Sequence, residues 1–347
     1  MGGENNLLLD VQDLHKAFPL KGGGFRRRTV GYIRAVDGVS FSVAKGETVG
    51  VVGESGCGKT TLGRCIVRIY KPTSGEIALH LGDRTLAVHQ LRSEDSRLFR
   101  SNVQMIFQDP YSSLDQHMNI LSLVGEPLLV NGIARGKEIE ERVAEMIRRV
   151  GLHIEHLRRF PHSFSGGQRQ RISIARTLIF NPKLLIADEP VSALDASIQA
   201  QILNLLIDLQ QEFGLSYLFI THNMSVIRYV SDRILVMYAG KLVEMAPKEP
   251  LLTEPRHPYT EALLSSVPRV SRRDGVRSVT YGEPPDLLHL PSGCVFHPRC
   301  KYAQGICKEE EPNLRPIGPD RFVSCHLADD LQLWGVQSSP RPVSPGY

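Results

Sequence analysis

Eight residues, Gly53-Glu54-Ser55-Gly56-Cys57-Gly58-Lys59-Thr60, carry the clearest chemical pattern in this chain. Two glycines bracket four residues and are followed by Lys-Thr, which is the P-loop pattern. The backbone N–H groups of such a loop curl around a phosphate, and the following helix N-terminus adds partial positive charge. We therefore predict that this loop and Thr61 bind ATP, with Lys59 at the β- and γ-phosphates and the Thr60 hydroxyl on Mg²⁺.

Two carboxylates and a glutamine could complete this chemistry. Asp188 ends an apolar run, where a Mg²⁺-holding carboxylate is expected, and Glu189 follows it directly. Adjacent carboxylates are costly unless a cation lies between them, and Glu189 could polarise a water as a general base. Gln108, which follows another short apolar run, could contact Mg²⁺ or that water. The alternatives are an acidic turn before Pro190 and a solvated loop glutamine.

A second helix start suited to an anion is predicted at Ser165-Gly166-Gly167-Gln168, ahead of a helix over 168–179. It combines a hydroxyl, two permissive glycines and a helix dipole. One nucleotide needs only one P-loop, so this start indicates a phosphate held by a neighbouring subunit. A simple helix N-cap is the alternative.

Alternating strands and helices are expected to position these residues. Residues 92–181 are predicted to be mostly helical, with an amphipathic helix over 137–150. A hairpin is predicted to turn at Ala239-Gly240. Apolar runs predict further strands at 7–14, 39–43, 48–52, 183–188 and 217–221. The expected fold is an α/β nucleotide-binding core with one helical subdomain.

Composition excludes several classes of protein. No apolar run approaches the roughly 20 residues of a membrane helix, and the first residues lack the basic and apolar pattern of a secretory signal. A net charge of +4 over 347 residues is too mild to imply a nucleic-acid partner. We expect the chain to stay in the cytoplasm or at the cytoplasmic surface of a membrane.

Residues 165–171 resemble the signature motif of ATP-binding cassette (ABC) ATPases, Ser192-Ala193-Leu194-Asp195 is similar to their D-loop, and His222 resembles their switch histidine. The resemblance covers about 7–264 and implies a P-loop NTPase cassette with a RecA-like core, an antiparallel β subdomain and a helical subdomain. It also implies a head-to-tail dimer, in which each ATP lies between one P-loop and the other signature. His222 would contact the γ-phosphate. The residues so implied to bind ATP include Ser165, Gly166, Gly167, Gln168 and Asp195, and an aromatic on adenine that is Phe18 or its competitor Tyr32.

Segments 161–168, 189–195 and 257–260 further resemble the ATPase subunits of bacterial oligopeptide and dipeptide importers. This resemblance implies a peripheral protein at the cytoplasmic face of the inner membrane. Its partners would be two integral membrane permease subunits, a second and different ABC ATPase subunit and, indirectly, a solute-binding protein. Self-pairing into a homodimer stays an alternative. The rival functions are a soluble non-transport ABC ATPase acting on nucleic acid or ribosomes and a redox or nucleic-acid-binding module.

Four cysteines cluster near the C-terminus, with spacings that fit neither common zinc ribbons nor ferredoxin runs. Chemistry alone leaves zinc, with His297 and His326 as further ligands, an iron–sulfur cluster, or reduced thiols. Segment 293–300 resembles the C-terminal extension of the importer ATPases, which implies a 4Fe-4S cluster on Cys294, Cys300, Cys307 and Cys325. The predicted domains are the cassette at 1–264 (helical subdomain about 92–181), a Cys- and Pro-rich extension at 265–335 and a disordered tail at 336–347.

Overall fold

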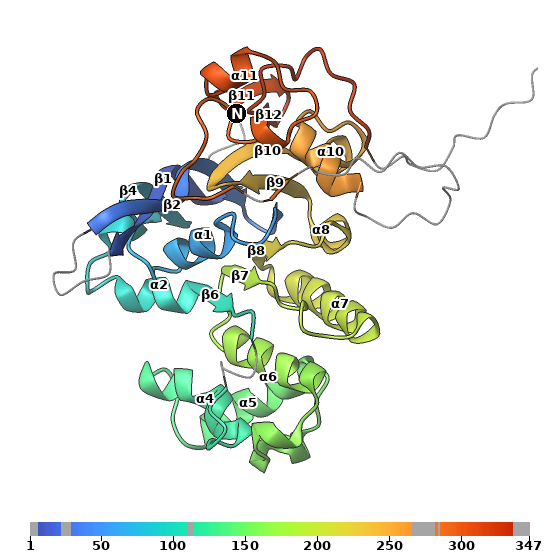
Figure 1. Cartoon of the computed structure of the whole chain (residues 1–347). Helices are drawn as coiled ribbons and strands as arrows, with labels where there is room; N and C mark the ends of the chain where they lie inside the picture. Colours follow the sequence, from blue (N-terminus) through green and yellow to red (C-terminus); the bar gives the residue numbers. More distant parts are fainter. Residues whose placement is uncertain (1–5, 22–28, 110–113, 266–281, 284, 336–347) are drawn as a thin grey trace, which may run out of the picture. The chain divides into compact units, whose positions relative to one another are not determined.

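The computed structural model describes residues 6–21, 29–109, 114–265, 282–283 and 285–335 (Figure 1). They divide into two compact units, each built from several stretches of the chain. The first unit comprises Met1–Gln12, Phe41–Thr48 and Leu62–Ile220. The second unit comprises Asp13–Ser40, Val49–Thr61 and Thr221–Tyr347.

Three parallel strands form the centre of the first unit. β7 (Leu184–Asp188) pairs with β6 (Val103–Ile106) on one side and with β8 (Ser216–Thr221) on the other. Every residue of β7 and β8 is buried, which agrees with the mostly apolar sequence of both strands. The register places Asp188 opposite Ile220, so the acidic end of β7 lies at the carboxyl edge of these strands.

Helices of the first unit pack beside these strands and on one another. α4 (Ile120–Val130), α5 (Lys137–Arg149) and α6 (Gly166–Leu178) form one group in Figure 1. A Cβ on Gly125 would lie 2.5 Å from Cγ2 of Ile139, so the glycine lets α4 and α5 approach closely. The remaining helical elements of this unit are α2 (Ser96–Asn102), η2 (Val88–Gln90), η3 (Ile154–Arg158), η4 (Pro161–Ser163) and α7 (Ala196–Phe213).

A four-stranded sheet has the order β2-β1-β4-β5. Its members are β1 (Leu7–Lys21), β2 (Thr29–Ala44), β4 (Ser74–Leu81) and β5 (Arg84–Ala87). β1 and β2 each run from one unit into the other along the chain. Both strands are longer than the sequence predicted: β1 includes the predicted strand at 7–14, and β2 includes the one at 39–43.

Strands of the second unit bring the C-terminal segment, defined as residues 285–335, onto a shared sheet. β3 (Thr48–Val52) runs parallel to β9 (Arg233–Tyr238), and β10 (Lys241–Pro247) returns antiparallel to β9. The turn between β9 and β10 uses positive φ at Ala239 and Gly240, which confirms the predicted hairpin. β12 (Arg321–Val323) pairs with β10, and β11 (Arg315–Gly318) pairs with β12. The helical elements are α1 (Lys59–Ile66), whose end reaches the first unit, and α8 (Met224–Val230), α9 (Lys248–Thr253), α10 (Pro258–Ser265), η5 (His297–Arg299) and α11 (Ile306–Glu309).

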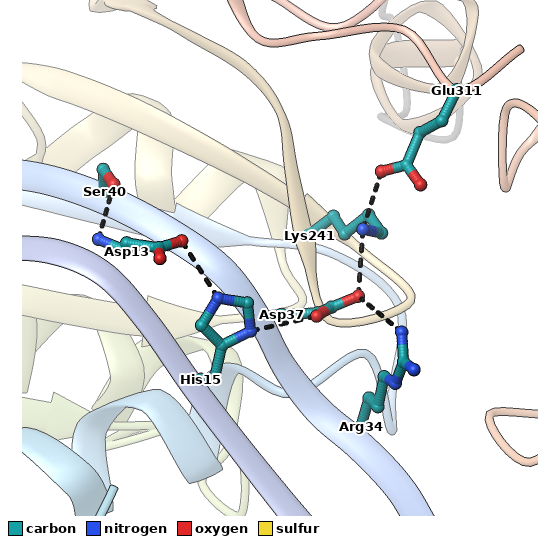
Figure 2. Close-up of polar contacts among 7 residues, drawn as sticks. All are labelled: Asp13, His15, Arg34, Asp37, Ser40, Lys241 and Glu311. Carbon is teal, nitrogen blue, oxygen red and sulfur yellow. Dashed lines mark hydrogen bonds and ion pairs between the residues drawn. The ribbon is translucent and has the colours of Figure 1, made fainter. Parts of the chain in front are cut away.

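A row of charges ties the C-terminal segment to strands of the second unit (Figure 2). Lys241 Nζ lies 2.7 Å from a carboxylate oxygen of Glu311 and 2.9 Å from one of Asp37. His15 contacts Asp37 through Nδ1 at 3.0 Å and Asp13 through Nε2 at 2.9 Å. Burial opposes ionisation of Asp37, but the hydrogen bond and charge of Lys241 hold its pKa below the usual value. Lys241 thus lies between two carboxylates, one of them in the C-terminal segment.

The prediction of a 4Fe-4S cluster, and the zinc alternative with it, is wrong. In the ranges that the structure describes, no three His, Cys, Asp or Glu side chains form a group that could hold a metal ion. Cys307 and Cys325 instead lie in a small apolar core, and Cys294 packs against it. Burial raises the pKa of Cys294 to about 11, that of Cys325 to about 12, and that of Cys300 as well, which favours the neutral thiol.

Two further expectations concern membrane-spanning helices and the terminal segments of the predicted domains. Among the helices of those residues, none combines the length and apolar character needed to cross a membrane. The predicted disordered tail at 336–347 lies outside the described residues, as do residues 22–28. The cassette boundary at 264 stays a prediction.

The thiols of the C-terminal segment should react slowly in the folded protein. A thiol reacts as its thiolate, so a pKa of about 11 in place of 9.0 lowers the thiolate fraction of Cys294 by about 100-fold at pH 8. We expect DTNB to modify Cys294 and Cys325 at least that much faster once urea unfolds the chain. Peptide mass spectrometry identifies the sites. Equal rates in the folded and unfolded protein would contradict the apolar packing.

Candidate nucleotide site

The loop between β3 and α1 bends where its glycines allow it. Gly56 has a φ of +81° and Gly58 a φ of +107°, conformations that side chains rarely adopt. A Cβ on Gly58 would lie 1.9 Å from the carbonyl oxygen of Ala35. A Cβ on Gly56 would meet no atom of the described residues within 4 Å. The loop is thus packed tightly at Gly58 and open at Gly56, which suits a cradle of N–H donors around a phosphate.

Lys59 begins α1 and turns its ammonium back onto the loop. Nζ donates hydrogen bonds to the carbonyl oxygens of Gly53 (2.7 Å) and Glu54 (2.8 Å), and the residue is only 5% exposed. Burial raises the pKa of the neighbouring Cys57 thiol although Lys59 opposes the shift, so that thiol stays neutral. A buried cation held within an open phosphate-sized loop is the arrangement that a triphosphate requires.

Glu54 makes two contacts that the sequence did not predict. Its N–H donates to the hydroxyl of Tyr259 in α10 at 2.7 Å, and its carboxylate accepts two hydrogen bonds from Arg299. Both partners lie in segments that the sequence marked only through family resemblance. No periodicity or spacing connects residue 54 with residues more than two hundred positions later, so only the folded chain reveals these contacts.

Gln108 and Glu189 meet in the first unit, although 81 positions separate them. Nε2 of Gln108 donates to Oε2 of Glu189 at 3.2 Å. Glu189 adopts a φ of +47°, which is uncommon for a residue with a side chain, and its N–H donates to the carbonyl of Ile220 at 2.8 Å. Asp188, the preceding residue, is 1% exposed. Strained backbone of this kind concentrates where function needs a particular side-chain direction.

The signature segment forms a capped helix start. Ser165 is the N-cap of α6: its hydroxyl accepts from the N–H of Gln168, and the Gln168 side chain accepts from the N–H of Ser165. A Cβ on Gly167 would lie 2.5 Å from Cγ2 of Ile198 in α7, and one on Gly166 would lie 3.5 Å from a methyl of Leu194. These glycines therefore allow α6 to begin directly against the D-loop.

The remaining residues predicted to bind nucleotide lie at helix starts, in one turn and on strands β1 and β2. Asp195 is the exposed N-cap of α7, and His222 is exposed in the turn that follows β8. Thr60 and Thr61 lie in the first turn of α1. Phe18 on β1 is partly buried, with Lys16 Nζ 4.9 Å from its ring centroid, whereas Tyr32 on β2 is 60% exposed. That Phe18, with Tyr32 as its competitor, contacts the adenine stays a prediction.

A cleft of about 580 Å³ opens in the first unit next to Gln108. It reaches from the end of β6 to helices α4 and α6. Phe107, which is 40% exposed, and Gln108 itself contribute to its wall. Gln108, which hydrogen-bonds Glu189, therefore forms part of the wall of this cleft.

Comparison with known proteins places these features in a family. Residues 36–192 match the ABC transporter family, and residues 243–307 match the family described as oligopeptide/dipeptide transporter, C-terminal region. The oligopeptide transport ATP-binding protein AppF of Bacillus subtilis is 51% identical over 92% of this chain and 97% of its own length. The dipeptide transport ATP-binding protein DppF of Escherichia coli is 45% identical over 93% of this chain and 95% of its own length.

Solved structures show the same cassette fold. The dimeric post-hydrolysis state of the ATP-binding cassette MJ0796, bound to ADP and Pi, is similar with a TM-score of 0.59 and 27% identity over 70% of this chain and 99% of that one. The structure of cbiO1 from Clostridium perfringens is also similar, with a TM-score of 0.58 and 27% identity over 71% of this chain and 90% of that one. With AppF more than half identical over nearly the whole length, this chain belongs to the ATP-binding proteins of the oligopeptide and dipeptide ABC transporters.

Proposed function

We propose that this chain is the ATP-hydrolysing subunit of an ABC importer for peptides or similar solutes. The observation that carries the proposal is the hydrogen bond between Gln108 and Glu189 beside the buried Asp188. It joins, at the end of a buried strand, a carboxylate and an amide that can hold and polarise a water. The relatives named above are transport proteins, which favours an importer over the non-transport ATPase considered from the sequence.

The proposed reaction is attack of water on the γ-phosphorus. Glu189 accepts a proton from the water while the water oxygen forms the new bond to the γ-phosphorus. The bond between that phosphorus and the oxygen bridging to the β-phosphate breaks, which releases ADP and inorganic phosphate. Lys59 and the P-loop N–H groups bind the phosphates, and His222 stabilises the charge that develops on the γ-phosphate oxygens.

Magnesium fits the donor set assigned from the sequence. The hydroxyl of Thr60, the amide oxygen of Gln108 and the carboxylate of Asp188 are the hard oxygen ligands that this ion prefers. When bound, Mg²⁺ would neutralise part of the negative charge of the phosphates. The residues that carry these oxygens lie on α1, on the segment after β6 and on β7.

We further propose that two cassettes pair head to tail, with the signature of each completing the partner's ATP site through Ser165, Gly166, Gly167, Gln168 and Asp195. The exposed start of α6 and the dimeric state of the MJ0796 cassette support this pairing. The partner subunit in this pair is a second, different ATPase chain, and a homodimer of this chain is the alternative. The pair would act on two permease subunits from the cytoplasmic face of the membrane. The cleft beside Gln108 is where a permease segment could reach the hydrolytic residues.

The proposed base can be tested by one isosteric change. Glu189→Gln keeps the shape of the side chain but cannot accept the proton, so kcat should fall by about 100-fold or more. The affinity for ATP, measured with a fluorescent analogue, should stay within about twofold of the parent because binding rests on the P-loop.

Glu212→Gln is the matched control, because Glu212 is an exposed carboxylate that pairs with Arg149 on the helix surface. It should hydrolyse ATP at the parent rate. Parent-like hydrolysis by Glu189→Gln would instead remove the general-base assignment.

The shared-site proposal predicts a defect in the other chain. In the assembled pair, Ser165→Trp should block vanadate trapping of 8-azido-ATP on the mate, whose site uses this signature. Labelling of the variant chain itself should persist, since its own P-loop is intact. Ser74→Trp, at an exposed position of β4, serves as control. Loss of label from the variant chain alone would show that Ser165 serves its own nucleotide.

A further inference from the structure

We propose that Arg299 of the C-terminal segment is a positioning residue for the P-loop: it turns the Glu54 carboxylate away from the bound phosphates and fixes the loop around them. The inference rests on the proposed ATP binding and adds a residue outside the nucleotide motifs discussed above. It makes the C-terminal segment part of the machinery that sets nucleotide affinity. All residues involved lie in the second unit.

The contact is a two-pronged ion pair. Nη1 of Arg299 lies 2.7 Å from Oε2 of Glu54, and Nη2 lies 2.9 Å from Oε1. The Arg299 side chain is only 7% exposed and that of Glu54 is 25% exposed. Paired hydrogen bonds from a planar guanidinium fix the orientation of a carboxylate as well as its charge. The side chain of Glu54 therefore has one favoured direction, toward Arg299.

Aromatic packing holds Arg299 in place. Phe296, three residues earlier, is 2% exposed and packs edge-on against Tyr238, with ring centroids 5.1 Å apart. Tyr259 packs against the same two rings at 4.7 and 5.4 Å. Nη1 of Arg299 also donates to the hydroxyl of Tyr238 at 3.3 Å. The Arg299 side chain is thus buried beside an aromatic cluster, which restricts its conformation.

Glu54 is fixed at three points. Its N–H donates to Tyr259, its carbonyl accepts from Lys59, and its carboxylate binds Arg299. The first two contacts fix the backbone of the cradle, and the third controls a negative charge located within it. Because a triphosphate is strongly anionic, an unpaired carboxylate in this loop would weaken nucleotide binding. The pair with Arg299 neutralises that charge.

Other contacts seat the C-terminal segment independently of Arg299. Lys301 Nζ lies 3.0 Å from the buried carboxylate of Glu261, and Tyr302 contacts the same group. Glu311 pairs with Lys241 (Figure 2), and β12 pairs with β10. A change at Arg299 alone therefore leaves several anchors of the segment, so its effect on ATP can be separated from loss of the fold.

The test measures ATP affinity and turnover of the full chain, with its mate where hydrolysis requires one. Arg299→Met, which keeps a long side chain in the aromatic cluster, should raise the Kd for ATP about tenfold, the scale of one charge-assisted hydrogen bond. The kcat at saturating ATP should stay within about twofold, because the hydrolytic residues lie elsewhere. An unchanged Kd would overturn the proposal.

A second change distinguishes charge control from general support. In the double variant Glu54→Gln/Arg299→Met, the unpaired carboxylate is gone, so the Kd should return to within about threefold of the parent. A merely structural arginine predicts that the double variant binds ATP no better than Arg299→Met. That result would refute the charge-directing role.

Controls separate the possible failures. Arg315→Met breaks an exposed ion pair with Asp329 in the same segment and should leave the Kd unchanged. If Arg299→Met does not fold, Arg299→Lys keeps the charge but loses the two-pronged geometry; it should raise the Kd about threefold, and a parent Kd would overturn the proposal. A parent chain that does not bind ATP would refute the proposed function, whereas equal affinity in parent and variants refutes only this inference.

Discussion

The negative charge of a triphosphate is the constraint on which this structure depends. A loop that binds it must present N–H groups and a cation while every nearby carboxylate is paired or directed. The second unit meets the first requirement with glycines and the buried Lys59. It meets the second with Arg299, which binds the one acidic side chain within the loop.

The same charge gives different tasks to the acidic residues at the end of β7. Asp188 is buried at the strand end, where a carboxylate is tolerable only with a compensating cation. Glu189 follows in a left-handed conformation that gives its side chain a different direction, toward Gln108. In the proposed mechanism the adjacent carboxylates take the separate roles of metal ligand and base, and the left-handed backbone at Glu189 is a strained conformation.

Much of the fold was predictable because its elements are strongly periodic or fully buried. The apolar run ending at Asp188 became β7, and the amphipathic pattern over 137–150 became α5 (Lys137–Arg149). β6 was missed inside a region expected to be helical, since its four residues are too few to show a period. The P-loop was predicted from local spacing and the helix start at Ser165 from its residue types, because both are local features, whereas the signature was assigned from the family resemblance. The contact of Glu54 with Arg299 was not predicted, because these residues lie far apart in the sequence and meet only in the folded chain.

The cysteines show the opposite error, in which a family resemblance implied a staple that the structure does not support. The C-terminal segment is rich in proline. In the structure it is held by strand pairing to β10, by a small core that includes the thiols, and by ion pairs at Glu54, Glu261 and Lys241. These contacts join the C-terminal segment to other parts of the second unit, so the order of the segment depends on them. The dependence is mutual at one point: the carboxylate within the phosphate-binding loop is paired only when the C-terminal segment is folded against it.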